Sequence, residues 1–571
     1  MTQSIHIFLL YIVFFLGSPP LQLFAQPDIQ EQVHIHTDKD LYLNGEMVWI
    51  KIYVRDTRFF LPTNLSKIVL LELWDENGTI HQQSKALLQD GMGEAHWTLP
   101  SDLSTARYLI RAYTKWMANG PSSSFCHQAI LVVNPNSPLP LQEAQAIDPS
   151  PDNPDPSSPS PPESLDIVLT CQQQAETGEE IVIEIESKTS DGQAVPAHIS
   201  LSVALQLPTS SLLSSPIQFS PRADDQQEGV LPDLFGIGVH GTLTNQQGRK
   251  ATGGRVVLSL PGKIPFVRIS RTNAEGRFSF LLDNIYGNRE IMIGAVDSTG
   301  TLARIQLDAD ILGDVPYFLT PFSFSPQDLP WIQDYLVHAQ LQQAYQHHFA
   351  PQSLTSIPSL QSFYGQPNRM YELGEYTRFD TEETFHEILY SVSLKKKHEQ
   401  FSFRVLDEYN SALMERDPLV MVDGVPINDA NKLIDLPSKM IERIEVVTAY
   451  YYLNGEKLQG IIHAVTEEGD AQSVSFPQSY LRRPYAFLSP PAQYSGVKGE
   501  ESSTGNGRLP DMRSLLCWEP HIQTNDQGRA VIRFRTSDLP GNFQIRAKGM
   551  SHTGQWGESE APLSVQFTHK Q

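Results

Sequence analysis

The sequence predicts a mostly β, multidomain protein that combines β-sandwiches with one small α+β domain. With 571 residues, the chain is long enough for about three to five domains. Short runs of alternating apolar and polar residues recur along most of it, and Gly, Asn, Asp or Pro stands between them. Such runs are typical of strands that bury one face in a sandwich.

Residues 33–135 predict the first sandwich. Apolar residues occupy every second position from Val48 to Val54, so they share one face of a strand. Asn44-Gly45, just before this strand, is a turn signal of the hairpin type. We therefore expect an N-terminal domain of short antiparallel strands.

This segment resembles the macroglobulin-like domains of the α2-macroglobulin family. The resemblance rests on Thr37-Asp38-Lys39, Tyr42, Gly45-Glu46 and the later stretch Tyr108–Met117. It implies a β-sandwich. The thioester motif of that family, Cys-Gly-Glu-Gln, does not occur in the sequence, so the resemblance does not imply covalent trapping of proteases.

Two further segments also resemble macroglobulin-like modules, and we expect them to be separate domains. Residues 166–205 follow a Pro- and Ser-rich linker at 136–165, and they predict a partial module. Residues 510–567 contain Trp518-Glu519-Pro520 and the turn-and-strand sequence TSDLPGNFQI, which are similar to a segment of the same family.

Residues 237–310 predict another β module. Asn273–Gly276 supplies a turn, and Phe278, Phe280 and Leu282 lie on one side of the strand that follows. This order of strand, turn and T-x-x-x-G-R-F-x-F resembles the transthyretin-like, carboxypeptidase-regulatory domain. The resemblance implies a structural or docking module without catalytic residues.

Two segments are predicted to be helices, one from the spacing of its apolar residues and one from a capping signal. Residues 330–348 predict a helix whose apolar face contains Trp331, Tyr335, Leu336, Leu341 and Tyr345. Residues 379–392 predict a second helix, in which Asp380 is the N-cap and Glu383 completes a capping box.

Residues 379–470 resemble the plug domain of TonB-dependent outer-membrane transporters. The matching pieces are Val420–Ile427, which contains a VDGVPI turn, the strand Ile441–Thr448, and the strand Gly460–Thr466. A plug of this family sits in a barrel of about 22 strands, each about 9–11 residues long. About a hundred residues follow Asp470 without barrel patterning, so we expect a plug-like module without its barrel.

Composition and the N-terminus predict an exported protein. The net charge of −23 excludes nucleic-acid binding as a leading function, because phosphate contacts need a basic face.

Residues 1–25 are predicted to be a signal peptide, with the apolar run Ile5–Leu16. No later run is long and apolar enough to predict a transmembrane segment. The expected location is the periplasm or the outer membrane.

The sequence predicts no catalytic site, cofactor or metal site. Walker, G-x-S-x-G, H-E-x-x-H and C-x-x-C motifs do not occur in it. His34 and His36 share one face of a strand, which suits chelation, but we expect a solvated strand face instead. Cys126, Cys171 and Cys517 are expected in different domains, and their disulfide state is left open.

Four residues of the plug-like segment are candidate partner-binding residues: Asp423, Gly424, Arg443 and Glu445. Asp423-Gly424 also suits a tight turn. The predicted function is that of a non-enzymatic cell-envelope protein, which docks to an outer-membrane barrel or another envelope protein in association with TonB-dependent uptake. The alternatives are a macroglobulin-type protease inhibitor without a thioester, and the barrel-less remnant of a transporter.

Overall fold

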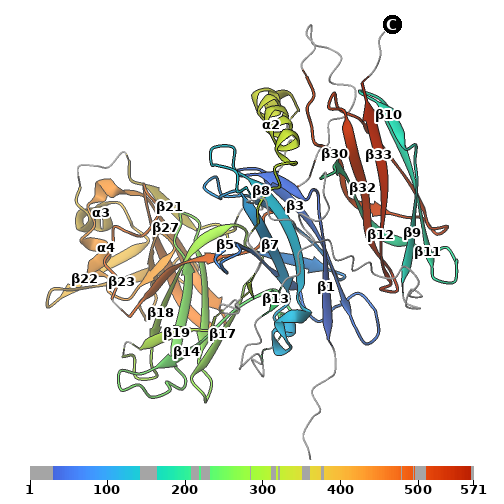
Figure 1. Cartoon of the computed structure of the whole chain (residues 1–571). Coiled ribbons are helices and arrows are strands. Elements are labelled where there is room, and N and C mark those ends of the chain that lie inside the picture. The colour runs from blue at the N-terminus through green and yellow to red at the C-terminus, as the bar shows by residue number, and fades with distance from the viewer. Residues whose placement is uncertain are drawn as a thin grey trace, which may run out of the picture.

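The computed structural model confirms a mostly β, multidomain protein (Figure 1). It describes residues 30–141, 164–207, 218–219, 230, 232–282, 284–301, 303–309, 317–318, 322–349, 360–374, 379–477, 479–492, 494 and 510–567. The predicted signal peptide and most of the predicted Pro-rich linker lie outside these residues.

The first sandwich is formed by one strongly bent sheet with the strand order β1-β3-β6-β5-β4-β7-β8-β2. Its elements are β1 (Glu31–Thr37), β2 (Leu41–Leu43), β3 (Met47–Asp56), β4 (Ile68–Trp74), β5 (Ile80–Gln89), β6 (Met92–Thr98), β7 (Ala106–Tyr113), η1 (Trp116–Asn119), η2 (Ser122–Ser124) and β8 (Cys126–Val133). Every second residue of β3, from Val48 to Val54, points into the core, as the alternation predicts.

The second sandwich combines two segments that lie far apart in the sequence. The segments contribute β9 (Leu165–Thr170), β10 (Gln174–Glu176), β11 (Glu180–Thr189) and β12 (Ala197–Leu205), and β30 (Leu515–Gln523), β31 (Arg529–Arg535), β32 (Gly541–Ser551) and β33 (Trp556–Gln566). The sheets are β10-β33-β32-β12-β30 and β31-β11-β9. We name this domain the composite sandwich.

The composite sandwich corrects the prediction of two separate modules at 166–205 and 510–567. Strand β12 pairs with β32 along its whole length, from Ala197↔Ser551 to Leu205↔Phe543. The apolar face of each segment is therefore buried by the other segment. Cys171 and Cys517, expected in different domains, belong to the same sandwich, and neither forms a disulfide.

The third sandwich also receives a strand from a distant segment. Its elements are β14 (Ile237–Thr244), β15 (Arg255–Leu260), β16 (Phe266–Arg271), β17 (Arg277–Leu282), β18 (Asn288–Val296), β19 (Arg304–Leu307) and β29 (Leu481–Ala486). The sheets are β17-β14-β19 and β16-β15-β18-β29. As predicted for their strand, Phe278, Phe280 and Leu282 face the core. A short ladder of β13 (Gln218–Phe219) and β20 (Tyr317–Phe318) lies outside these sheets.

The α/β module lies between the last two strands of the third sandwich. It contains β21 (Arg369–Glu372), α3 (Thr381–Glu387), β22 (Val392–Lys397), β23 (Gln400–Asp407), β24 (Ala412–Leu413), β25 (Leu419–Val422), β26 (Val425–Ile427), α4 (Asn431–Ile434), η4 (Ser438–Met440), β27 (Ile441–Leu453) and β28 (Glu456–Thr466). Its sheets are β21-β27-β28-β25-β26 and β22-β23-β24.

The predicted capping box at Asp380 and Glu383 is confirmed. Helix α3 is shorter than the predicted 379–392, because Val392 starts strand β22 and its side chain packs into the core of the α/β module.

The domains are nested rather than consecutive. The α/β module is inserted into the third sandwich, and the third sandwich is inserted between the two halves of the composite sandwich. Figure 1 shows the α/β module at one end, followed by the third, first and composite sandwiches. Spatial order therefore differs from sequence order.

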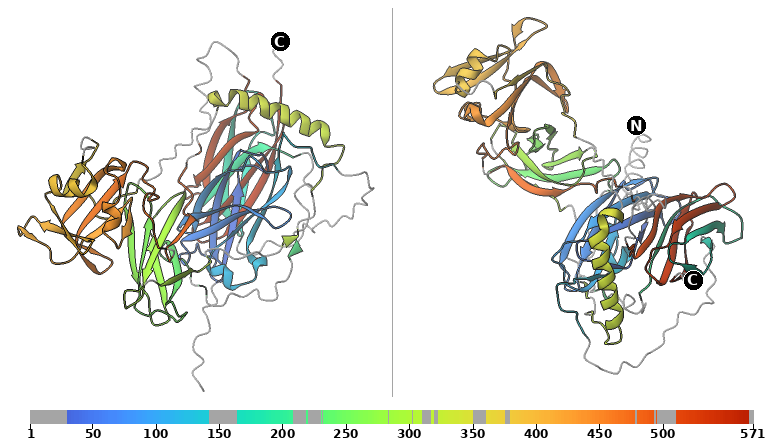
Figure 2. Two further views of the ribbon diagram at one scale, coloured as in Figure 1. Left: turned by 90° about the vertical axis from the view of Figure 1, so that its left-hand side faces the viewer. Right: turned by 90° about the horizontal axis from the view of Figure 1, so that it is seen from above.

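Helix α2 (Leu329–Phe349) lies across the first and composite sandwiches (Figure 2). Ile332 and Tyr335 pack in one apolar cluster with Leu131 of the first sandwich and Leu207 of the composite sandwich. The predicted apolar face is partly wrong, since Ile332 is buried and Leu341 is exposed.

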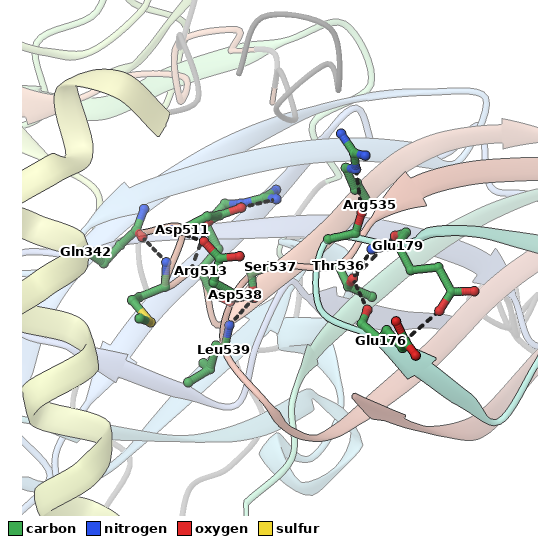
Figure 3. A network of polar contacts seen from close by, with 12 residues as sticks. Glu176, Glu179, Gln342, Asp511, Arg513, Arg535, Thr536, Ser537, Asp538 and Leu539 are labelled. Atoms are coloured by element: carbon green, nitrogen blue, oxygen red, sulfur yellow. Dashed lines mark hydrogen bonds and ion pairs between the residues drawn. The ribbon is translucent and has the colours of Figure 1, made fainter. Parts of the chain in front are cut away.

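The same helix is tied to the composite sandwich by polar contacts (Figure 3). Gln342 accepts a hydrogen bond from the Met512 amide at 3.1 Å, and Arg513 forms an ion pair with Asp511 at 2.7 Å. The Asp511 amide in turn donates to Asp538 at 3.0 Å. The helix thus connects the start of the C-terminal segment to the first sandwich.

Candidate functional site

The first and composite sandwiches contact each other through one sheet of each, and these two sheets pack face to face. One face of β1 and β3 fills the core of the first sandwich, and the other face meets β12, β30 and β32. In β12 the same alternation applies: Ile199 and Leu201 point into their own core, and Ser200 and Ser202 point across. We call this contact the joint.

His36 is almost completely buried in the joint, with 2% of its surface exposed. Its Nδ1 lies 2.7 Å from the Ser200 hydroxyl, and its Nε2 lies 3.1 Å from the Ser202 hydroxyl. The Tyr53 hydroxyl donates to the Ser200 hydroxyl at 3.1 Å. A neutral imidazole satisfies both hydroxyls, because it has one N–H donor and one acceptor.

His34 stacks on Trp556 of β33, with the ring centroids 4.1 Å apart. The buried Nε2 of His34 has no hydrogen-bond partner among the described residues. Burial, followed by the positive charges of Arg55 and Lys548, lowers the pKa of His34 to about 3. Burial, followed by Lys548 and Arg546, lowers the pKa of His36 well below 6.5, although its contact with Ser200 opposes this shift.

Close backbone approaches fix the edge of the joint. Arg55 donates to the Gly554 carbonyl at 3.4 Å, and Lys548 donates to the Ile35 carbonyl at 3.3 Å. Arg546 forms an ion pair with Asp40. A Cβ at Gly554 would overlap the Phe60 carbonyl, so glycine is required for this approach.

A cleft of about 900 Å³ opens beside the joint. Four histidines line it: His96, His198, His521 and His552. Glu94 accepts from Lys51 at 2.7 Å and pairs with His521 at 2.9 Å, which joins the two sandwiches. Burial lowers the pKa of His96, and burial, followed by the charge of His552, lowers that of His198.

The expectation that His34 and His36 lie on a solvated face is therefore wrong. Alternation shows that the two faces of a strand differ, but it cannot show that a second sheet covers the polar face. A signal was present, since the outward residues of β1 and β12 are His and Ser rather than Lys and Glu. Among the described residues, no group of three or more His, Cys, Asp or Glu side chains is arranged to hold a metal ion.

Asp423 and Gly424 form a tight turn that is buried inside the molecule. Both residues have positive φ, of 46° and 76°. The Asp423 carboxylate accepts hydrogen bonds from the amide and hydroxyl of Thr466, both at 2.7 Å, and from the Ala471 amide at 2.9 Å. A Cβ at Gly424 would lie 3.1 Å from the Leu260 carbonyl, so the turn packs against the third sandwich.

A chain of buried hydrogen bonds continues from this turn. The Gly424 amide donates to His463 Nε2 at 2.9 Å, which places the proton of a neutral ring on Nδ1. That Nδ1 lies 2.9 Å from the Tyr364 hydroxyl, which donates to Glu445 at 2.5 Å. The chain links the module's central sheet to the segment that precedes it.

Arg443 completes the chain by donating to Glu445 at 2.8 Å. Burial alone would raise the pKa of Glu445, but hydrogen bonds from His463, Tyr364 and Arg443 outweigh it and lower the pKa to about 2. The partner-binding role predicted for Asp423, Gly424, Arg443 and Glu445 stays a prediction, and these contacts show that all four residues also hold the module together. Their polar groups are used within the chain, and only Arg443 keeps appreciable exposure.

Comparisons with known proteins find only distant likeness. No family model matches the chain, and no curated protein matches it. A Salmonella alpha-2-macroglobulin reacted with methylamine has 10% identity and a TM-score of 0.24, over 94% of this chain and 39% of that one. The native conformation of Escherichia coli alpha-2-macroglobulin has 11% identity and a TM-score of 0.24, over 96% and 40%.

This chain thus spans about two fifths of the length of those proteins. A likeness with so low a TM-score carries no argument about family or activity. The resemblances to macroglobulin-like, transthyretin-like and plug domains stay predictions. In the part of the chain that the structure describes, no helix is long and apolar enough to cross a membrane.

Proposed function

We propose that this chain is a non-enzymatic, exported protein of a Gram-negative cell envelope that docks to another envelope protein through its α/β module. The observation that carries the proposal is the position of that module. It lies at one end of the molecule (Figure 1), and the buried turn at Gly424 packs closely against the third sandwich.

The exposed aromatic residues of the module support a docking role. Tyr409 has 95% of its surface exposed, Tyr452 68% and Tyr390 66%. Tyrosine contributes a large apolar contact area and a polar hydroxyl, so it is enriched at protein interfaces. The docking residues of this proposal are therefore these tyrosines, instead of the buried turn and ion pair. The resemblance to a plug favours an outer-membrane barrel as the partner, in association with TonB-dependent uptake.

Cross-linking in native envelopes, read by mass spectrometry, tests the proposal. The test variant combines Tyr390→Ser, Tyr409→Ser and Tyr452→Ser. The matched control combines Val168→Ser, Leu281→Ser and Val531→Ser, which are also exposed apolar residues but lie on other sandwiches. Deletion of 420–470 is a poorer test, because it removes the central strands β27 and β28.

Docking predicts cross-links to an envelope protein that disappear in the tyrosine variant and persist in the control. Cross-links that persist in both variants would exclude these tyrosines as the docking site. A protease trapped after cleavage within 136–165 would instead favour the macroglobulin-type inhibitor, and the lack of any partner would favour the transporter remnant.

A further inference from the structure

We propose that the joint between the first and composite sandwiches is an acid-sensitive contact, which is closed at neutral pH and opens when His34 and His36 become protonated. The inference does not depend on the proposed docking function. It rests on where the imidazoles lie, on what faces them, and on how the rest of the contact is built.

The first argument is the concentration of histidine at one contact. The sequence has 17 histidines, and six of them lie in the joint or line the cleft beside it: His34, His36, His96, His198, His521 and His552. Histidine is the side chain whose ordinary pKa lies between pH 5 and 8. His34 and His36 are the two of these rings that lie between the facing sheets, so the proposal rests on them.

The second argument is the sign of the charges that face the two buried rings. Arg55 and Lys548 face His34, and Lys548 and Arg546 face His36. The uncharged groups around them are Tyr53, Ser200, Ser202, Trp518 and Trp556. An added proton would therefore place buried positive charge beside existing positive charge.

The nearby carboxylates already have other partners. Asp40 and Glu560 pair with Arg546, and Glu558 lies 3.6 Å from Lys548. Asp38, at the end of β1, accepts from the Tyr42 hydroxyl and the Trp49 amide within the first sandwich. Glu94, at the cleft, holds Lys51 and His521. Among the described residues, no carboxylate forms a hydrogen bond or ion pair with His34 or His36, so a proton on either ring is uncompensated.

The third argument is that a second contact can act as a hinge. The cluster around Ile332 and Tyr335 of helix α2 joins the same two sandwiches through apolar side chains such as Leu131 and Leu207. The aliphatic contacts of this cluster do not depend on protonation. Acid therefore weakens the joint while α2 keeps the sandwiches attached.

The pH range follows from linkage. The open joint binds protons with an ordinary histidine pKa of about 6.5, whereas the closed joint lowers the pKa of His34 to about 3. The closed joint therefore keeps its full stability above about pH 6.5 and loses it as the pH falls between these values. At pH 4.5, His34 alone shifts the equilibrium toward the open joint by about 100-fold.

Hydroxyl-radical footprinting of the full chain, read by mass spectrometry, tests the proposal. Oxidation of Trp518 and Trp556 should rise about threefold or more from pH 7.5 to pH 4.5, since the buried ring of Trp518 and the partly buried ring of Trp556 become more accessible in the open joint. Trp74 and Phe543, in the cores of the two sandwiches, should stay protected. This pattern distinguishes opening of the joint from unfolding.

The variant His34→Phe/His36→Gln should lose the acid response, because Phe can still stack on Trp556 and Gln can still bond to Ser200 or Ser202, but neither titrates. The control His386→Gln/His398→Gln changes two histidines of the α/β module and should respond like the parent chain. An unchanged Trp556 in the parent chain at pH 4.5, or an equal response in the joint variant, would overturn the proposal.

A second variant keeps the test decisive if the double substitution prevents folding. Lys548→Gln removes the cation that faces both imidazoles and keeps an amide donor for the Ile35 carbonyl, so the midpoint of the acid transition should move to lower pH. A midpoint that stays in place would show that the response does not arise from these rings.

Discussion

The buried carboxylate of Asp423 gives the sharpest test of how the α/β module is held together. Asp423→Ala removes the acceptor of three hydrogen bonds from Thr466 and Ala471. Two backbone amides and one hydroxyl then lose their partner in a site where the Asp423 side chain has no exposed surface. Each unsatisfied buried donor costs about 1–3 kcal/mol, and part of this is recovered because a buried charge is removed. We expect a loss of about 3 kcal/mol.

Positive φ at residue 423 adds to this loss, since alanine adopts the left-handed region less readily than Asp or Asn. Asp423→Asn keeps one side-chain oxygen and tolerates this backbone. It should therefore cost about half as much, because its NH₂ group cannot accept from the Ala471 amide.

Amide hydrogen exchange is the suitable assay, because a multidomain chain does not unfold in two states. In Asp423→Ala, amides of β28 and of residues 466–471 should exchange about 100-fold faster, and amides of β7 and β32 should not change. Asp470→Ala is the matched control, since its partly exposed carboxylate accepts from the Gln472 amide at 2.9 Å and from no other group among the described residues. An acceleration of less than about tenfold in Asp423→Ala would refute the reasoning.

Three further predictions follow from other contacts. Gly424→Ala should destabilise the contact between the α/β module and the third sandwich by about 1–2 kcal/mol, because residue 424 has positive φ and a Cβ there meets backbone atoms of residues 260–265. Faster proteolysis between the two domains would show this loss, and Gly455→Ala, in an open turn, is the control. Glu445 should contribute fully to the stability of the α/β module above about pH 4.5, and this contribution should fall as the pH approaches 2, because hydrogen bonds lower the pKa of Glu445 to about 2. Glu445→Gln should flatten the pH dependence of amide exchange in β27, and an unaltered slope would contradict this. In a chain that ends at residue 509, the amides of β12 should lose protection from hydrogen exchange, and those of β7 should keep it. The reason is that β12 loses its neighbours β30 and β32, which pack with Ile199, Leu201 and Val203. Continued protection of β12 would contradict the composite sandwich.

Short-range features were predictable from the sequence because they depend on neighbouring residues. The alternation from Val48 to Val54 determines a strand and its core face, and Asp380 with Glu383 determines where helix α3 begins. The mostly β fold class follows from many such runs. The VDGV turn was also recognised, since positive φ at two successive residues requires Asp-Gly or a similar pair.

Only the tertiary structure decided which segments pair and which polar faces are buried. The pairing of β12 with β32 joins residues more than 300 positions apart, and no local pattern specifies the partner of a strand. For the same reason, alternation identified the polar face of β1 but not the sheet of the composite sandwich that buries it, so His34 and His36 were expected to be solvated. The physical cause is that periodicity records which side of a strand is apolar, whereas the burial of the other side depends on the shape and charge of a distant sheet.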